Sequence, residues 1–93
     1  MNISVSDLLK LKSPNIIDIR PVQNYNNNHI PTAKNIPYTN LLTRPDIYLN
    51  KKDKYYIYCK SGNTSKGLCQ ILQKQGYQVY NVLGGYEAWI LEA

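Results

Sequence analysis

The most informative part of the chain reads Tyr55-Tyr-Ile-Tyr-Cys59-Lys-Ser-Gly-Asn-Thr-Ser65. Its first five residues are aromatic, β-branched or cysteine, and all are apolar, which is typical of a central strand covered by helices on both faces. Residues 60–65 are small and polar and indicate a tight loop. Leucine and isoleucine then recur at helical spacing over residues 66–75 until Gly76, which ends a helix. We therefore predict a strand, a loop and a helix in succession, with the strand in the middle of a sheet.

Shorter patterns on the N-terminal side predict further strands and helices. Ser4-Val-Ser-Asp7 has the form of a capping box and begins a helix, and proline at position 21 suits the first turn of another. In chain order we predict a strand at Ile3, a helix with an apolar face of Val5, Leu8, Leu9 and Leu11, a strand at Asn15–Arg20, a helix from Pro21 to the asparagines at 26–28, a brief strand within His29–Pro37, and broken helical turns over Tyr38–Leu49.

The C-terminal side completes the alternation. Gln78–Val82 predicts another strand, Gly84-Gly85 a turn, and Tyr86–Leu91 a short helix anchored by Trp89. Alternating strands and helices of these lengths imply a mostly parallel sheet with helices on both faces. The predicted fold class is therefore α/β.

The length and composition limit the kinds of protein this chain can be. Ninety-three residues allow one compact domain, because chains this short rarely form two self-sufficient cores. With 43% hydrophobic residues, including nine Tyr and one Trp, the chain is too apolar for a disordered segment. Its apolar runs are far shorter than the roughly 20 residues of a bilayer crossing, and the N-terminus lacks a basic region followed by an apolar stretch. We expect a single domain over residues 1–93, in an unprocessed cytoplasmic protein without a membrane partner.

The charge of the chain favours an anionic partner. Eleven Lys and Arg residues against six Asp and Glu give a net charge of +5. The densest positive cluster, Lys51, Lys52 and Lys54, is interpreted as a solvated loop face, because no basic stripe with exposed aromatic residues accompanies it. We therefore predict no nucleic-acid partner. Cys59 and Cys69 are expected to be reduced, since a secreted chain this small usually carries several disulfides.

Cys59 ends the predicted central strand and is the candidate nucleophile. In an open α/β sheet, ligands gather beyond the carboxyl ends of the strands. A loop curled around the sulfur would point backbone N–H groups at it, and the start of the next helix would add about half a positive charge. Lys60 and Lys66 would further favour the reactive thiolate, and Gly62 would permit a tight loop. The alternative is a buried cysteine without a chemical role, because free cysteine is among the most buried residue types.

Four segments resemble, in the same order, the motifs of the rhodanese-like sulfurtransferases, particularly the small single-domain thiosulfate sulfurtransferases. The segments are Asp18-Ile-Arg20, His29-Ile-Pro31 with Ala33 and Asn35-Ile-Pro37, Cys59-Lys-Ser-Gly-Asn-Thr-Ser65, and Gly84-Gly-Tyr-Glu-Ala-Trp89. The third resembles the family's active-site loop, which begins with the catalytic cysteine and carries glycine at its fourth position. The resemblance runs nearly end to end and implies a three-layer rhodanese-like fold, whose central, mostly parallel five-stranded sheet has helices on both faces.

The resemblance also implies a reaction. The Cys59 thiolate would attack the outer sulfur of thiosulfate or a related anionic sulfur donor, release sulfite and keep the sulfur as a persulfide. A cyanide-like acceptor or a thiol, which includes the thiol of a protein, would then remove that sulfur, and no metal or organic cofactor is required. The predicted catalytic residue is Cys59, and the predicted substrate-binding residues are Lys60, Ser61, Gly62, Asn63, Thr64 and Ser65.

Some residues depart from the family pattern. Many members have arginine at the second or sixth position of the loop, where this chain has Lys60 and Thr64, so the preference among donors stays open. The glycines common on either side of the family's His-Ile-Pro are replaced by Asn28 and Thr32. Because asparagine tolerates left-handed backbone and threonine does not, we expect a different local turn around Thr32.

Other residues of these motifs are interpreted as structural. Asp18 and Arg20 are expected to pair and tie a strand to neighbouring loops. His29 is the single histidine and could serve as a general base, but the resemblance places it in a structural turn. Cys69 is expected to lie in the core, beyond bridging distance of Cys59.

Two other functions compete with sulfur transfer. The first is a noncatalytic or persulfide-carrying interaction module: the presence of Cys59 argues against a domain without chemistry but not against a persulfide carrier. Cysteine phosphatases use a related loop, but a Cys-x5-Arg site needs a guanidinium at position 65, where this chain has Ser65. A valine at Gly62 is expected to crowd the concave face of the loop and to lower activity more than stability.

Overall fold

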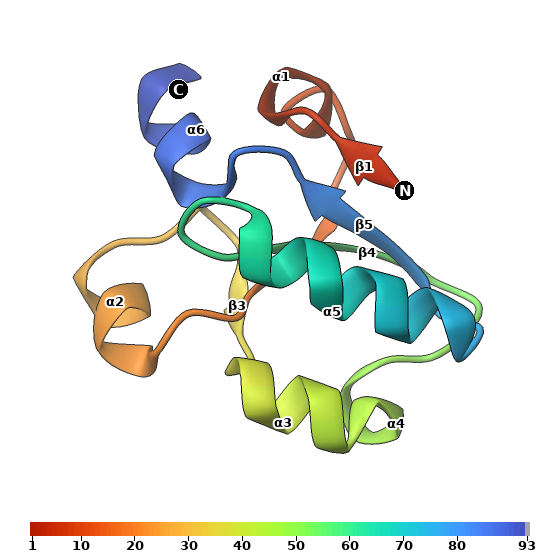
Figure 1. Cartoon of the computed structure of the whole chain (residues 1–93). Helices are drawn as coiled ribbons and strands as arrows, with labels where there is room; N and C mark the ends of the chain where they lie inside the picture. The colour runs from red at the N-terminus through yellow and green to blue at the C-terminus, as the bar shows by residue number, and fades with distance from the viewer. Residues whose placement is uncertain (93) are drawn as a thin grey trace.

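The computed structural model of the protein describes residues 1–92 (Figure 1). Within them, strands and helices alternate along the chain. The strands are β1 Asn2–Ile3, β2 Asn15–Asp18, β3 Lys34–Asn35, β4 Lys54–Tyr58 and β5 Gln78–Val82. The helices are α1 Val5–Leu8, α2 Val22–Asn27, α3 Tyr38–Thr43, α4 Pro45–Tyr48, α5 Asn63–Lys74 and α6 Gly85–Glu92. The predicted α/β class is confirmed.

The strands form one five-stranded sheet in the order β1-β5-β4-β2-β3, and every neighbouring pair is parallel. β4 lies in the middle, with Tyr56 opposite Ile16 of β2 and Tyr80 of β5. The predicted central position of this strand is confirmed. Because parallel strands end at the same edge of a sheet, the residues that follow β4 lie near those that follow β2 and β5.

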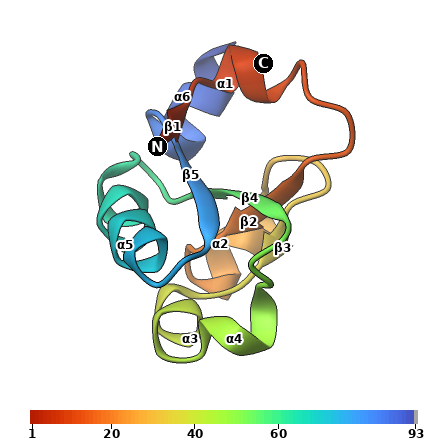
Figure 2. The same ribbon diagram turned by 90° about the vertical axis from the view of Figure 1, so that its right-hand side faces the viewer.

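Helices cover both faces of the sheet, as Figures 1 and 2 show. Along β4, Tyr55 and Ile57 pack with core residues of α3 and α5, whereas Tyr56 and Tyr58 pack with those of α1 and α6. A strand directs alternate side chains to opposite faces, so a strand covered on both sides is apolar at every position. No helix within residues 1–92 is long and apolar enough to cross a membrane.

The first helix is shorter than predicted. Ser4 caps it as expected, because its hydroxyl accepts the backbone N–H of Asp7 at 3.1 Å. The helix nevertheless ends at Leu8, where the chain turns away towards β2. The prediction that Leu9 and Leu11 form part of the apolar face of this helix is wrong, since both lie beyond its end and their side chains are 52% and 39% exposed.

Two further boundaries differ from those predicted. β2 ends at Asp18 rather than at Arg20, because the Asp18 carboxylate accepts the backbone N–H of Arg20 at 2.9 Å and turns the chain out of the sheet. α5 begins at Asn63 rather than at Lys66. Of the leucine and isoleucine residues at helical spacing in α5, Leu68 and Leu72 are buried, whereas Ile71 is 40% exposed.

A buried ion pair lies at the carboxyl end of β2, and the hydroxyl of Tyr58 joins it to the end of β4. The carboxylate of Asp18 is fully buried, and its Oδ2 accepts hydrogen bonds of 2.7 Å from Nη2 of Arg20 and from the hydroxyl of Tyr58. The same hydroxyl accepts the backbone N–H of Ile30 at 3.1 Å. Nη2 of Arg20 also donates to the carbonyl oxygen of Asn28 at 2.6 Å. The expected pairing of Asp18 with Arg20 thus ties two strands to the segment that precedes β3.

The turn before β3 contains a residue in an unfavourable conformation. Thr32 has a φ of +72°, in the left-handed region that is costly for a β-branched side chain. A hydrogen bond of 3.0 Å from the backbone N–H of Ala33 to the carbonyl oxygen of Ile30 closes this turn. Thr32 therefore adopts the conformation that we expected threonine to avoid, and the anchoring of Ile30 in the core holds it there.

The change Tyr58→Phe tests the buried network. Burial, and then the hydrogen bond to Asp18, raise the pKa of the Tyr58 hydroxyl, so that it stays protonated and donates. Phenylalanine keeps the ring but removes this donor and leaves the N–H of Ile30 without its acceptor. We expect the free energy of unfolding, measured by urea denaturation, to fall by about 1–3 kcal/mol.

The matched control is Tyr80→Phe. Tyr80 is half-buried and stacks on Tyr56 with ring centroids 5.3 Å apart, a contact that phenylalanine keeps. This control should change the free energy of unfolding by less than about 0.5 kcal/mol. Equal losses in the two variants would show that the Tyr58 hydroxyl contributes nothing specific.

Candidate functional site

The residues after β4 wrap around the sulfur of Cys59. This cysteine follows β4 at the carboxyl edge of the sheet, and its side chain is 7% exposed. Its Sγ accepts the backbone N–H groups of Gly62 at 3.2 Å and of Ser65 at 3.4 Å. The hydroxyl oxygen of Ser65 also lies 3.4 Å from Sγ. On its loop side, the sulfur therefore faces polar hydrogens rather than apolar packing.

The sulfur takes the place of a helix cap. The residue before α5 is Gly62, which has left-handed backbone (φ +94°) and provides no side-chain cap. A Ser, Thr, Asp or Asn side chain is preferred at that position, where it accepts an N–H of the first turn. Here the sulfur of Cys59 accepts the N–H of Ser65 in the first turn of α5. This contact explains why α5 begins earlier than predicted, and it directs the positive end of the helix dipole at the sulfur.

These contacts lower the pKa of Cys59. Burial by itself raises it, but hydrogen bonds from the Ser65 hydroxyl and from the backbone N–H groups of Ser65, Gly62 and Ser61 outweigh that effect. Burial raises the pKa of Cys69 to about 12. The two thiols therefore differ, and Cys59 ionises first as the pH rises.

The residues predicted to bind substrate contribute unequally. The backbone N–H groups of Ser61, Gly62 and Ser65 point at the sulfur. Four side chains of this stretch are exposed, those of Lys60, Ser61, Asn63 and Thr64. The prediction that residues 63–65 are part of the loop is wrong, because they form the first turn of α5.

A residue that no sequence pattern singled out, Asn81, fixes Ser65. Both residues are buried, and the hydroxyl of Ser65 donates to Oδ1 of Asn81 on β5. An asparagine in the buried part of a strand was the available signal, since buried polar groups need partners. The hydroxyl has one proton, and three acceptors surround it when Cys59 is ionised: the thiolate, the carbonyl oxygen of Gly62 and Oδ1 of Asn81.

The start of α6 holds the loop from behind. The backbone N–H of Tyr86 donates to the carbonyl oxygen of Cys59 at 2.9 Å, and that of Glu87 donates to the carbonyl oxygen of Lys60 at 3.0 Å. The C=O and N–H of a planar trans peptide point in opposite directions. Anchoring the carbonyl of Lys60 on α6 therefore turns the N–H of Ser61 towards the sulfur. The sequence predicted only a turn before this helix.

Two glycines permit this close approach. A Cβ at Gly85, where φ is +59°, would collide with the carbonyl oxygen of Cys59 and lie 2.8 Å from that of Lys60. A Cβ at Gly62 would lie 3.0 Å from the backbone nitrogen of Gly84. The expectation that a side chain at Gly62 would crowd the concave face is wrong, because it would press on the turn after β5. Such a change is expected to lower stability together with activity.

The residues interpreted as structural make structural contacts. His29 stacks on Tyr25 with ring centroids 3.8 Å apart, and its Nδ1 lies 2.8 Å from the carbonyl oxygen of Tyr25. These contacts tie His29 to α2. Cys69 is 2% exposed among the core residues of α5, and both cysteines are free thiols.

The change Gly85→Ala tests the contact between α6 and the loop. The added methyl group would meet loop carbonyls at a backbone conformation that L residues rarely adopt. We expect the free energy of unfolding to fall by about 2 kcal/mol or more, and the alkylation of Cys59 to slow. Gly67→Ala is the matched control, because a Cβ on this residue of α5 meets no neighbouring atom within 4 Å; it should stabilise the helix by up to about 1 kcal/mol. Unchanged stability in Gly85→Ala would contradict the proposed contact.

The lowered pKa of Cys59 links stability to pH. The pKa of Cys59 in the folded protein lies below the value of about 8.5 expected in the unfolded chain. The stability that ionised Cys59 contributes is therefore complete at a pH above the unfolded pKa, and it is lost as the pH falls through the folded pKa. The difference in free energy of unfolding between the wild type and Cys59→Ser should therefore rise with pH, at up to about 1.4 kcal/mol per pH unit, and then level off. Cys69 is present in both proteins and cancels. Urea denaturation across this range measures the difference, and a flat or falling curve would contradict the shift.

Comparison with known proteins covers nearly the whole chain. The model of the rhodanese-like domain family matches residues 4–92. The chain is 37% identical over 79 residues to the "Putative sulfur carrier protein YrkF" of Bacillus subtilis, a match that covers 84% of this chain and 42% of YrkF. It is 32% identical over 87 residues to the thiosulfate sulfurtransferase GlpE of Coxiella burnetii, and this match covers 89% of this chain and 78% of GlpE. The chain thus spans less than half of YrkF and most of GlpE.

The fold agrees with these matches. The crystal structure of a rhodanese-related protein from Thermoplasma volcanium superposes with a TM-score of 0.90 at 29% identity, over 99% of this chain and 92% of that one. The three-layer arrangement around a parallel five-stranded sheet is therefore the rhodanese-like fold that the sequence predicted. The four motifs lie within the matched residues, and the chain belongs to the rhodanese-like domain family.

Proposed function

We propose that this chain is a sulfurtransferase that works through a persulfide on Cys59. The Cys59 thiolate attacks the outer sulfur of thiosulfate or a similar anionic donor. A new S–S bond forms, the bond between the two donor sulfurs breaks, and sulfite leaves with the electron pair. A cyanide ion or a thiolate then attacks the outer sulfur of the persulfide, and Cys59 leaves as the thiolate that began the cycle. The two steps together need no further oxidant or reductant.

The N–H groups aimed at the Cys59 sulfur are the observation that carries this proposal. Nucleophilic attack requires the thiolate, and these donors lower the pKa of the thiol. The same fixed donors would stabilise negative charge on the sulfurs during transfer. Lys60 and Lys66 are exposed on either side of the loop, and with the net charge of +5 they would attract an anionic donor.

The proposed donor site consists mainly of backbone. Arginine binds an anion through two parallel hydrogen bonds. This chain has Lys60 and Thr64 at the two loop positions where many family members carry arginine. We propose that the N–H groups around the sulfur and the Lys60 charge hold the donor, with the exposed Asn63 and Thr64 side chains at the rim. Charge, rather than bidentate contact, would then set the range of donors.

A persulfide carrier without turnover is the alternative function. It would use the same Cys59 thiolate and differ in the fate of the sulfur. The name of YrkF points to sulfur carriage and that of GlpE to catalysis. Phosphate-ester hydrolysis fits less well, because the side chain at position 65 is a buried serine whose hydroxyl donates to Asn81.

We further propose that residues 1–93 act as one rhodanese-like domain in the cytoplasm. Both cysteines are free thiols, and a reducing compartment keeps thiols in that state. The proposed partners are a small anionic sulfur donor and a thiol or cyanide-like acceptor. The residues of the chain itself supply the nucleophile and the anion site.

Thiocyanate formation from thiosulfate and cyanide tests the proposal. Cys59→Ser should lower the rate by at least about 100-fold, because serine is a far weaker nucleophile towards sulfur. Cys69→Ala, the matched control in the core, should keep it within about twofold. Full activity in Cys59→Ser would contradict the assignment of the nucleophile.

Mass spectrometry separates the enzyme from the carrier. After incubation with thiosulfate alone, trypsin releases Cys59 in peptide 55–60 and Cys69 in peptide 67–74. We expect one added sulfur atom on the first peptide and none on the second. An adduct without turnover would favour the carrier. The absence of both the adduct and turnover would overturn the proposal of sulfur transfer.

A further inference from the structure

The Ser65 hydroxyl points its proton away from the sulfur that it would stabilise. Burial raises the pKa of Cys59, and the hydrogen bond from the Ser65 hydroxyl makes the largest opposing contribution, ahead of the backbone N–H groups. In the structure, Oγ of Ser65 donates to Oδ1 of Asn81 and accepts the S–H of Cys59 at 3.4 Å. These contacts suit the neutral thiol. A thiolate needs the same hydroxyl to donate in the other direction.

Turning the hydroxyl alone would be costly. With its one proton on the thiolate, Oγ of Ser65 would face Oδ1 of Asn81 without a hydrogen between these two buried acceptors. Oδ1 accepts no other hydrogen bond from residues 1–92. A buried acceptor that loses its donor costs its full desolvation. The carbonyl oxygen of Gly62 is the less needy acceptor, because it already accepts the N–H of Lys66 at 3.1 Å.

The side chain of Asn81 can supply the missing hydrogen. Its amide has an acceptor and a donor of nearly the same size at its two ends. A half-turn about the Cβ–Cγ bond exchanges Oδ1 for Nδ2, which would then donate to Oγ of Ser65. The proton of Ser65 is thereby left for the thiolate, and every buried polar atom of the group keeps a partner.

A small polar cavity at the other end of the amide permits this turn. Nδ2 of Asn81 has no hydrogen-bond partner among residues 1–92, and no fully buried side-chain polar atom in that range lacks one, so Nδ2 reaches solvent. Asn81 lines a cavity of about 70 Å³ together with Lys66, Gln70 and Gln73, and this volume is large enough for water. Water accepts from Nδ2 and donates to Oδ1, so it satisfies the amide in either orientation.

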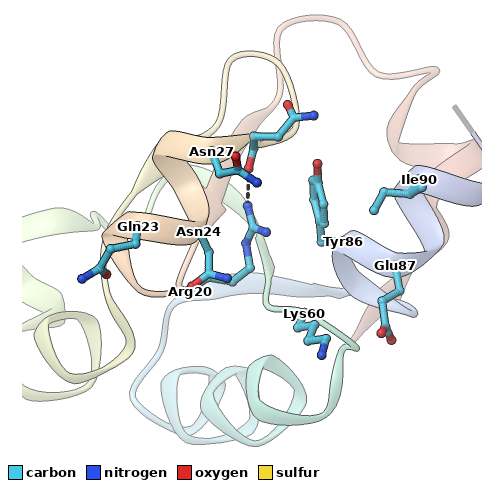
Figure 3. Close-up of a pocket in the computed structure, with 9 residues that line it drawn as sticks. Arg20, Gln23, Asn24, Asn27, Lys60, Tyr86, Glu87 and Ile90 are labelled. Atoms are coloured by element: carbon cyan, nitrogen blue, oxygen red, sulfur yellow. Dashed lines mark hydrogen bonds between the residues drawn. The ribbon is translucent and has the colours of Figure 1, made fainter.

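A larger hollow near the loop takes no part in this exchange. It is an open groove of about 570 Å³ between α2 and α6, lined by Lys60 and Tyr86 among others (Figure 3). The cavity at Asn81 shares no lining residue with this groove. A molecule in the groove would therefore leave the water at Asn81 in place.

We infer that Asn81 is a positioning residue whose amide reverses when Cys59 ionises, so that Ser65 donates to the thiolate. This inference rests on the proposed function for the role of that thiolate. In the thiol form, Cys59 donates to Ser65 and Ser65 donates to Asn81. In the thiolate form, Nδ2 of Asn81 donates to Ser65 and Ser65 donates to the sulfur. Ser65 keeps its own proton throughout, and the proton of Cys59 goes to solvent.

Other titratable groups lie on the segments packed around the sulfur and Asn81. They are Lys60 in the loop, Lys66 and Cys69 on α5, Glu87 on α6, Tyr38 on α3, Tyr55 on β4, the amino group of Met1 and the ion pair of Asp18 with Arg20. All of them are kept in the variants below. A difference in pKa between variants therefore reports the side chain that was changed.

Two variants test the reversal through the pKa of Cys59, measured from the pH dependence of its alkylation by iodoacetamide. Ser65→Ala removes the hydroxyl and should raise this pKa by about 1 or more, a tenfold change in the ionisation constant. An unchanged pKa in Ser65→Ala would overturn the inference. In Asn81→Leu, the thiol and the thiolate each lose one hydrogen bond to the amide, so the pKa should stay within about 0.3 of the wild-type value.

The direction of any larger shift in Asn81→Leu is decisive. A fall by about 1 would mean that the wild-type amide holds the hydroxyl away from the thiolate, and a rise like that of Ser65→Ala would mean that Asn81 only supports Ser65. Either result would overturn the reversal. Gln73→Leu is the matched control, because Gln73 lines the same cavity but donates to the carbonyl oxygen of Val79 at 2.8 Å. It should leave the pKa unchanged.

The reversal is also observed directly by NMR of the side-chain amides, labelled with 15N. In the thiol form both Nδ2 protons of Asn81 face water, and in the thiolate form one of them is bonded to Ser65. We expect exchange of that proton with water to slow about fivefold or more relative to the amide of Gln73 as Cys59 ionises, and not to slow in Cys59→Ser. The signal of Asn81 is identified by its loss in Asn81→Leu.

A ratio of exchange rates that stays constant across the ionisation of Cys59 would overturn the inference. Neither alkylation nor amide exchange uses a sulfur donor, whereas thiocyanate formation requires one. Failure of the inference and failure of the proposed function therefore give different results.

Discussion

The hydrogen bonds from backbone N–H groups to the sulfur of Cys59 are the constraint on which the site depends. They serve the fold, because the sulfur caps α5 where Gly62 offers no side chain. They also serve the chemistry, because a buried thiolate is costly unless donors surround it. One set of contacts therefore begins the helix and favours the thiolate form of Cys59. Since the donors belong to the main chain, they do not depend on which side chains the loop carries.

The surrounding structure keeps those donors aimed at the sulfur. The start of α6 binds the carbonyls of Cys59 and Lys60 from behind, and Asn81 on β5 fixes Ser65. The ion pair of Asp18 with Arg20 anchors the end of the neighbouring strand. These contacts come from α6, β5 and the end of β2, which meet at the same edge of the parallel sheet. A chain of this size thus gathers a rigid site and an adjoining groove at one edge.

The sequence predicted the elements whose local pattern has a single physical reading. β4 is apolar at every position but its first because both of its faces are buried, so its central place could be recognised from composition alone. The cysteine at its end had two interpretations, a nucleophile or a buried residue without a chemical role, and the assignment of Cys59 as the nucleophile stays a prediction. Pairing of Asp18 with Arg20 followed from their proximity along the chain.

Features made by distant residues could not be predicted. Asn81 lies 16 positions from Ser65, and Tyr58 lies 40 positions from the Asp18 that it binds. The early start of α5 depends on a sulfur outside the helix acting as its cap. Thr32 adopts a left-handed conformation against its own preference, because tertiary contacts outweigh a cost of about 1–2 kcal/mol. In each case, the partner or restraint is visible only once the chain is folded.

The most direct test of a thiolate held by the backbone is the rate at which iodoacetamide alkylates Cys59 as a function of pH. The tryptic peptides 55–60 and 67–74 report Cys59 and Cys69 separately. For Cys59, the rate should reach half its maximum below the pH of about 8.5 at which an ordinary cysteine ionises, and Cys69 should stay unreactive there. A midpoint at or above that pH, or equal reactivity of the two thiols, would contradict the account.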